Sequence, residues 1–127
     1  MQVILIQAPL IWENPEANRA YLEEKINAIV EEVNLIVLPE MFTSGFTMNP
    51  SAVAETMSGK TVTWLKALAK ARKCAITGSL VIKENQNFHN RLVFVFPSGE
   101  MEYYDKRHLF TLAGEEKVYA SGGQKIM

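Results

Sequence analysis

Two charged side chains stand directly after predicted strands, where open α/β sheets bind their ligands. Glu40 follows the apolar run at 35–38 and Pro39, which has no N–H to continue a strand ladder. Lys106 follows another predicted strand at 101–104. If both strand ends open into one crevice, the carboxylate can transfer protons and the ammonium can stabilise an oxyanion. A glutamate that caps a turn and a solvated surface lysine are the alternatives.

More charged groups follow Lys106 along the chain. Glu115 and Glu116 offer a second carboxylate, which would orient the lysine or contact a substrate nitrogen; an exposed acidic pair is the alternative. His108 belongs to a short cationic run, and His89 falls in a predicted turn region. Two separated histidines do not form the ligand cluster that zinc needs. We therefore predict no metal site.

Possible nucleophiles are few in this sequence. Cys74 is the single cysteine, and it begins an apolar strand after a helix, so we expect a buried, inert thiol. Ser44 and Ser79 carry hydroxyls, but neither lies in a Gly-x-Ser-x-Gly elbow. The candidate base and cation therefore have no obvious nucleophile beside them.

Composition indicates one soluble α/β domain. The 127 residues are 48% hydrophobic and 21% charged, which suffices for a core and argues against disorder. A formal net charge of -1 gives no sign of a nucleic-acid or membrane partner. One cysteine excludes an internal disulfide, no basic region precedes the apolar N-terminus, and no apolar run approaches the ~20 residues of a membrane span. We expect a cytoplasmic protein.

The first third of the chain has the pattern of a β-α-β unit. Residues 3–8 are nearly all apolar and predict a strand that Pro9 ends. Asn14-Pro15-Glu16 predicts a helix start, with apolar residues at helical spacing up to Val33. The apolar run at 35–38 then predicts a second strand, parallel to the first and buried on both faces.

Residues 58–61 read Ser-Gly-Lys-Thr, which invites a phosphate-loop interpretation. Ala54 stands where that motif needs a glycine, and no strand leads in, so an unrelated nucleotide-binding module is disfavoured. We predict instead a helix capped by Ser58 or Thr61, which ends near the cationic stretch at 70–73.

The second half predicts three more strands, at 74–82, 90–96 and 101–104. The turns between them are short, which favours antiparallel neighbours and hence a mixed sheet. Residues 105–120 are predicted to form a loop, and Lys125-Ile126-Met127 resembles the beginning of a strand. We therefore expect a partial domain at 1–127.

Aromatic residues gather after Glu40. Phe42, Phe46 and Met48 fall in a stretch with no clear periodicity, and Thr43-Ser44-Gly45-Phe46 predicts a turn. These side chains would line a pocket, or they would simply cover the end of the sheet. The residues alone leave both interpretations open.

Four stretches together resemble the nitrilase superfamily of carbon–nitrogen hydrolases, and bacterial omega-amidases in particular. They are residues 7–12 (Gln-Ala-Pro-Leu-Ile-Trp), 38–46 (Leu-Pro-Glu-Met-Phe-Thr-Ser-Gly-Phe), Asn90-Arg91, and 104–110 (Tyr-Asp-Lys-Arg-His-Leu-Phe). The resemblance implies an α-β-β-α sandwich, of which this chain is an N-terminal half with a mixed sheet and packed helices. It also implies hydrolysis of a small 2-oxo acid amide, such as 2-oxoglutaramate, to the acid and ammonia without a cofactor.

The resemblance also implies roles for individual residues. Glu40 matches the general base, Lys106 the oxyanion-stabilising lysine and Glu115 the second glutamate, with Glu116 leaving the register open. Phe42, Phe46 and His108 fall where the family contacts its substrate. The family's nucleophilic cysteine lies on a later strand, and Cys74 does not match it.

Two hypotheses follow from that departure. In the first, the chain is part of an omega-amidase-like enzyme and is inactive alone, because no acyl-enzyme forms without the thiolate. In the second, it is a non-catalytic truncated product. Half a sandwich leaves apolar sheet surface and an open edge, so we expect a homodimer or larger assembly in either case.

Overall fold

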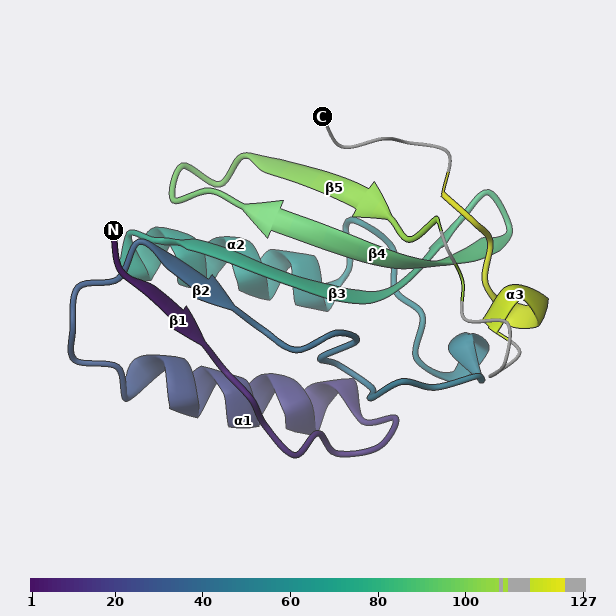
Figure 1. The fold of residues 1–127 in the computed structure, drawn as a ribbon, viewed down its shortest axis with the longest axis horizontal. Coiled ribbons are helices and arrows are strands. Elements are labelled where there is room, and N and C mark those ends of the chain that lie inside the picture. Colours follow the sequence, from purple (N-terminus) through teal and green to yellow (C-terminus); the bar gives the residue numbers. More distant parts are fainter. Residues whose placement is uncertain (108, 110–114, 123–127) are drawn as a thin grey trace.

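The computed structural model describes residues 1–107, 109 and 115–122, apart from the side chain of Glu116. Its centre is a five-stranded sheet whose strands lie in chain order (Figure 1). The parallel strands are β1 (Val3–Leu5), β2 (Leu35–Val37) and β3 (Ala75–Glu84). The antiparallel meander continues from β3 through β4 (Asn87–Val95) and β5 (Met101–Asp105). The predicted mixed sheet is confirmed.

The two long helices lie where the sequence predicts them. α1 (Pro15–Asn27) begins at Asn14, whose Oδ1 accepts a hydrogen bond from the backbone N of Ala17 at 3.1 Å. This is the capping that the Asn-Pro-Glu start indicates. α2 (Lys60–Arg72) ends at Lys73, which takes the left-handed conformation common at helix C-termini.

The start of α2 differs from the prediction. The capping residue is Gly59, which has no side chain to offer, rather than Ser58 or Thr61. Oε1 of Glu55 accepts from the backbone N of Thr61 at 2.8 Å, and Oε2 accepts from its hydroxyl. A carboxylate from a preceding segment therefore satisfies the free N–H groups of the helix, which sequence spacing at the helix start does not reveal.

α1 and α2 cover one face of the sheet and appear behind the strands in Figure 1. Leu22 and Ile26 of α1 and Leu65 of α2 are fully buried against Ile36 and Ile76 of the sheet. At Gly78 the chain needs a glycine, because an added Cβ would lie 2.8 Å from the ring of Phe42. This close approach lets the segment after β2 pack directly on β3.

Neither long helix covers the other face, which we call the open face. Toward the end of β3, Val53 and Tyr119 pack on Val81 of this face. The strand pairings place Val3, Leu5, Val37, Leu92 and Tyr104 on it. Leu5 is 68% exposed and Val37 is half-buried, whereas Ile36, on the helix side, is fully buried. The expectation that the β2 run is buried on both faces is therefore wrong for this chain, because among the described residues the two long helices cover one face only.

Several element boundaries also differ from the predictions, including those of β2 to β5. β1 ends at Leu5, although Ile6 N still donates to Val37 O at 2.9 Å. Residues 105–120, predicted to be a loop, include the short helix α3 (Glu115–Val118), and a 3-10 turn, η1 (Pro50–Ala52), follows the aromatic stretch. The strand predicted at 125–127 lies outside the described residues. Within the described part, none of the helices has the length and apolarity needed to cross a membrane.

Candidate active site

Glu40 lies just beyond the carboxyl end of β2, in a turn that β3 holds in place. Its side chain is 51% exposed at the edge of the open face. The next residue, Met41, has a φ of 51°, an uncommon value for a residue with a side chain. The backbone N of Met41 donates to Oγ of Ser79 at 2.8 Å, and the backbone N of Phe42 donates to the Ser79 carbonyl at 3.0 Å. Ser79 therefore fixes the turn that carries Glu40.

Lys106 lies between two carboxylates. Its Nζ is 3.4 Å from Oε2 of Glu40 and 3.2 Å from Oε1 of Glu115. Glu115 is fully buried and begins α3, whereas the Lys106 side chain is 28% exposed. The Nζ also lies 5.1 Å from the ring centroid of Phe46, within the range of a cation–π contact. The structure thus brings together the three residues that the sequence predicts to be catalytic.

Asn90 on β4 completes this cluster. Its Nδ2 donates to Oε2 of Glu40 at 2.9 Å, and its backbone carbonyl accepts from the backbone N of Lys106 at 3.0 Å. The sequence prediction assigns Asn90 no role at the site. The available signal is a polar residue on the apolar face of β4, but the register that pairs it with Val81 of β3 decides where it points.

A buried cation supports the end of β5 from the helix side. Arg91 is fully buried, and its guanidinium binds Asp105 at 2.6 and 2.9 Å and Glu84 at 3.0 and 3.1 Å. Burial alone would lower the pKa of Arg91, but its hydrogen bonds to the two carboxylates hold that pKa above its ordinary value. The guanidinium also lies 4.0 Å from the ring centroid of Tyr103. Because Asp105 directly precedes Lys106, this network fixes the strand end that carries the lysine.

A shallow hollow of about 300 Å³ opens beside Glu40 and Lys106 on the open face. Its walls include the apolar side chains Val37, Leu38 and Leu92 together with Ser79, Asn90 and Tyr104. Of the predicted substrate contacts, Phe46 lies beside Lys106. His108 lies outside the described residues.

Phe42 does not reach this hollow. Its ring is fully buried on the helix side, 6.2 Å from the ring of Trp64. The expectation that Phe42 contacts substrate stays a prediction, and its buried ring lends that prediction no support among the described residues. The turn at Met41 directs the next side chain toward the core, and a spacing of two residues from Glu40 does not reveal this.

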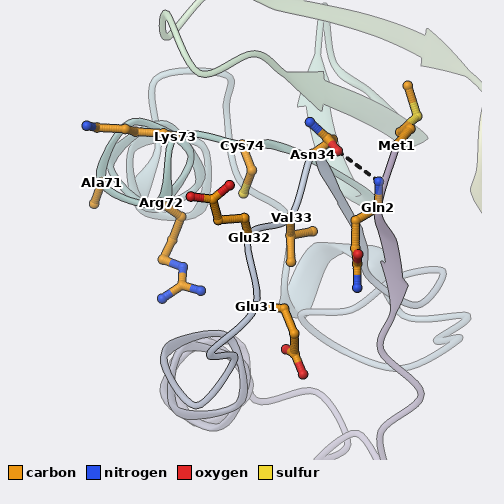
Figure 2. A pocket seen from close by; sticks show the side chains of 10 residues that line it. All are labelled: Met1, Gln2, Glu31, Glu32, Val33, Asn34, Ala71, Arg72, Lys73 and Cys74. Carbon is orange, nitrogen blue, oxygen red and sulfur yellow. Dashed lines mark hydrogen bonds between the residues drawn. The ribbon is translucent and has the colours of Figure 1, made fainter.

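A larger hollow, of about 840 Å³, lies at the opposite end of the parallel strands (Figure 2). Its lining includes Glu31, Glu32, Arg72, Lys73 and Cys74, which lie before β2 and β3 rather than after them. Cys74 is 2% exposed, and burial raises the pKa of its thiol even though Arg72 acts in the other direction. These facts match the prediction of a buried thiol and place it away from the Glu40 cluster.

The described residues form no group of three or more histidine, cysteine, aspartate or glutamate side chains that could hold a metal ion. The cluster instead combines an exposed carboxylate, a lysine ammonium, a buried carboxylate and an amide. Such a group can move a proton at Glu40 and stabilise negative charge near Lys106. This is the chemistry needed when a nucleophile attacks a carbonyl carbon.

Comparison with known proteins assigns this arrangement to a family. The sequence profile of the carbon-nitrogen hydrolases matches residues 2–126. The chain belongs to the carbon-nitrogen hydrolase family. As a member, it shares its mixed sheet and helix layer with solved structures of that family.

Omega-amidase YafV of Escherichia coli K12 is 35% identical to this carbon-nitrogen hydrolase over 127 residues. That match covers 100% of the chain and 49% of the relative. A 2-oxoglutaramate amidase of Bacillus subtilis is 28% identical over 123 residues, which cover 94% of the chain and 47% of the relative. The chain therefore spans about half the length of the curated relatives it matches.

The solved structure of XC1258 from Xanthomonas campestris superimposes with a TM-score of 0.93 at 37% identity. The match covers 98% of this carbon-nitrogen hydrolase chain and 47% of the other. That structure is described as a CN-hydrolase superfamily protein with an arsenic adduct in its active site. The likeness confirms the predicted fold class.

Proposed function

We propose that this chain supplies the general base and the cationic part of an omega-amidase-type active site. The substrate is the amide of a small 2-oxo acid, and the products are the acid and ammonia. One observation carries the proposal: Nζ of Lys106 lies within 3.4 Å of both Glu40 and Glu115. The omega-amidase and 2-oxoglutaramate amidase relatives support the choice of substrate. Phe46 and His108 are the proposed substrate contacts.

In the complete site, Glu40 accepts the proton of a cysteine thiol, and the thiolate attacks the amide carbonyl carbon. Lys106 stabilises the resulting oxyanion, and Glu115 holds Lys106 in place. The C–N bond then breaks, and Glu40 gives its proton to the leaving nitrogen, which departs as ammonia. Glu40 next takes a proton from water, the hydroxide adds to the thioester carbonyl, and the C–S bond breaks. The acid is released, and the thiol regains the proton.

Cys74 is not the proposed nucleophile. It is buried at the opposite end of the parallel strands, and its raised pKa favours the unreactive thiol over the thiolate. It is also the single cysteine in the sequence. We therefore propose that the attacking thiolate comes from a segment that residues 1–127 do not contain.

Ammonia release from 2-oxoglutaramate tests the proposal. The 127-residue chain alone should show no turnover, whereas the chain joined to the cysteine-bearing remainder of its own reading frame, or to that of the Escherichia coli relative, should be active. Glu40→Gln and Lys106→Ala should abolish the activity of the joined protein, and Cys74→Ser should keep it. Turnover by the isolated chain that survives Cys74→Ala would contradict this account, because it would need a different nucleophile.

A second candidate is a non-catalytic product that persists as an oligomer. It is favoured by the open face, where Leu5 is 68%, Val3 47% and Leu92 39% exposed. Burying such surface against another chain is favourable. Intact-mass measurement of the natural protein separates the candidates. If the naturally expressed polypeptide has 127 residues and no second chain supplies a cysteine, only the non-catalytic candidate remains.

A further inference from the structure

Asn90 contacts two of the proposed catalytic residues, Glu40 and Lys106, from within the sheet. Its Nδ2 donates to Oε2 of Glu40, and its backbone carbonyl receives the backbone N–H of Lys106. Asn90 is only 2% exposed, and its strand pairs with β3 along its whole length and with β5 from Arg91 to Val95. An exposed carboxylate is thus tied to a rigid, buried group.

The hydrogen-bonding pattern sets the orientation of the Asn90 amide. An ionised carboxylate only accepts hydrogen bonds, so the NH₂ group must face Glu40. The opposite atom, Oδ1, is buried and has no hydrogen-bond partner among the described residues. A buried acceptor without a donor destabilises the fold. The amide orientation therefore provides a donor to Glu40 and leaves the Oδ1 acceptor of Asn90 without a donor in the described part of the chain.

Both of the contacts described for Glu40 use the same carboxylate oxygen. Oε2 receives Nδ2 of Asn90 at 2.9 Å and lies 3.4 Å from Nζ of Lys106. Two donors therefore already occupy hydrogen-bonding positions of Oε2. The other oxygen, Oε1, then remains the one that takes up and returns protons.

We propose that Asn90 is a positioning residue that holds Oε2 of Glu40 and reserves Oε1 for proton transfer. The inference rests on the proposed function, because it assigns Glu40 as the base. Asn90 does not touch the reacting atoms. It acts by fixing the carboxylate plane and by marking which oxygen faces the nucleophile.

The contact is tested in the 127-residue chain without any assay of activity. In a ¹⁵N-labelled sample, the side-chain amide signal of Asn90 should move when Glu40 is changed to Gln. It should also follow the protonation of Glu40 in a pH titration, and that dependence should vanish in Glu40→Gln. Asn87, an exposed asparagine on the same strand, is the control and should respond to neither. An Asn90 signal that behaves like the Asn87 signal would overturn the proposal.

The catalytic consequence is tested in the joined, cysteine-bearing protein. Asn90→Leu, which keeps the size but removes the donor, should lower kcat by about 10- to 100-fold and leave KM nearly unchanged. Asn90→Asp, which puts a second carboxylate against Glu40, should lower kcat at least as much, while Asn87→Asp adds the same charge without effect. If Asn90→Leu does not fold, the isosteric Asn90→Asp carries this test.

The two proposals fail in different ways. If the unmodified joined protein releases no ammonia, the proposed function fails, and the amide signal of Asn90 still decides whether the contact exists. If the unmodified protein is active and a folded Asn90→Leu or Asn90→Asp variant keeps kcat within about twofold, the positioning role is overturned while the proposed function stands.

Discussion

Nζ of Lys106 lies 3.2 Å from Oε1 of Glu115, which is fully buried, and 3.4 Å from Oε2 of Glu40, which is half exposed. The buried carboxylate anchors the ammonium, whereas the exposed one faces the hollow on the open face. One lysine thus links the inside of the molecule to the candidate reaction site. This arrangement makes Lys106 important for stability as well as for chemistry.

Changing Lys106 to Met should destabilise the chain by roughly 3 kcal/mol, because it removes a cation that is paired with a buried carboxylate. Lys117→Met is the matched control: Lys117 is exposed on α3, and its loss should change stability by about 0.5 kcal/mol or less. Urea denaturation followed by circular dichroism measures both. Equal effects would mean that the Lys106–Glu115 pair contributes nothing specific.

Glu84 should make the stability depend on acid pH. Its hydrogen bond from Arg91, and next the charge of that guanidinium, hold the pKa of Glu84 below its ordinary value. A carboxyl group whose pKa is lower in the folded than in the unfolded protein stabilises the folded state. The full stabilisation is present at a pH above the unfolded pKa of about 4.3, and it is lost as the pH falls through the pKa of the folded state. Urea unfolding should therefore be measured at about pH 7 and about pH 3. The free energy of unfolding should fall less between these pH values for Glu84→Gln than for the unmodified chain. Identical losses would contradict the linkage.

Tyr119 should tie the segment of Glu115 to the aromatic stretch after Glu40. Its hydroxyl donates to the Thr47 carbonyl at 2.7 Å, and burial, with the charges of Glu115 and Glu13, raises the pKa of this phenol. Tyr119→Phe should cost about 1 kcal/mol of unfolding free energy, since it removes one buried hydrogen bond. Tyr103→Phe, at an exposed tyrosine, should be close to neutral in the same denaturation experiment. If Tyr119→Phe changes the free energy of unfolding as little as Tyr103→Phe does, the hydrogen bond is not formed in solution.

The open face should drive self-association of the 127-residue chain. Light scattering at micromolar concentration should report a dimer or larger, and Leu5→Glu should shift the chain toward the monomer by charging that face. Val30, 91% exposed after the end of α1, provides the control, and Val30→Glu should leave the assembly unchanged. An unmodified chain that is monomeric would refute this prediction.

Local patterns determine much of this fold. The apolar runs, the Asn-Pro-Glu helix start and the short turns predict two long helices and a mixed sheet, because each depends on residues only a few positions apart. They also place Glu40 and Lys106 at strand ends. The predicted capping residue of α2 was wrong, because the carboxylate that binds the helix start belongs to Glu55, which precedes the residues of a capping motif.

The tertiary structure decided which side chains meet. Asn90 contacts Glu40 across 50 positions and Lys106 approaches it across 66, and both contacts depend on the register of β4 and β5. The fold also turned Phe42 into the core and put Cys74 at the far end of the strands. The sequence by itself determined the elements and the residues able to do chemistry. Their convergence depended on packing and pairing between distant segments, which no local spacing encodes.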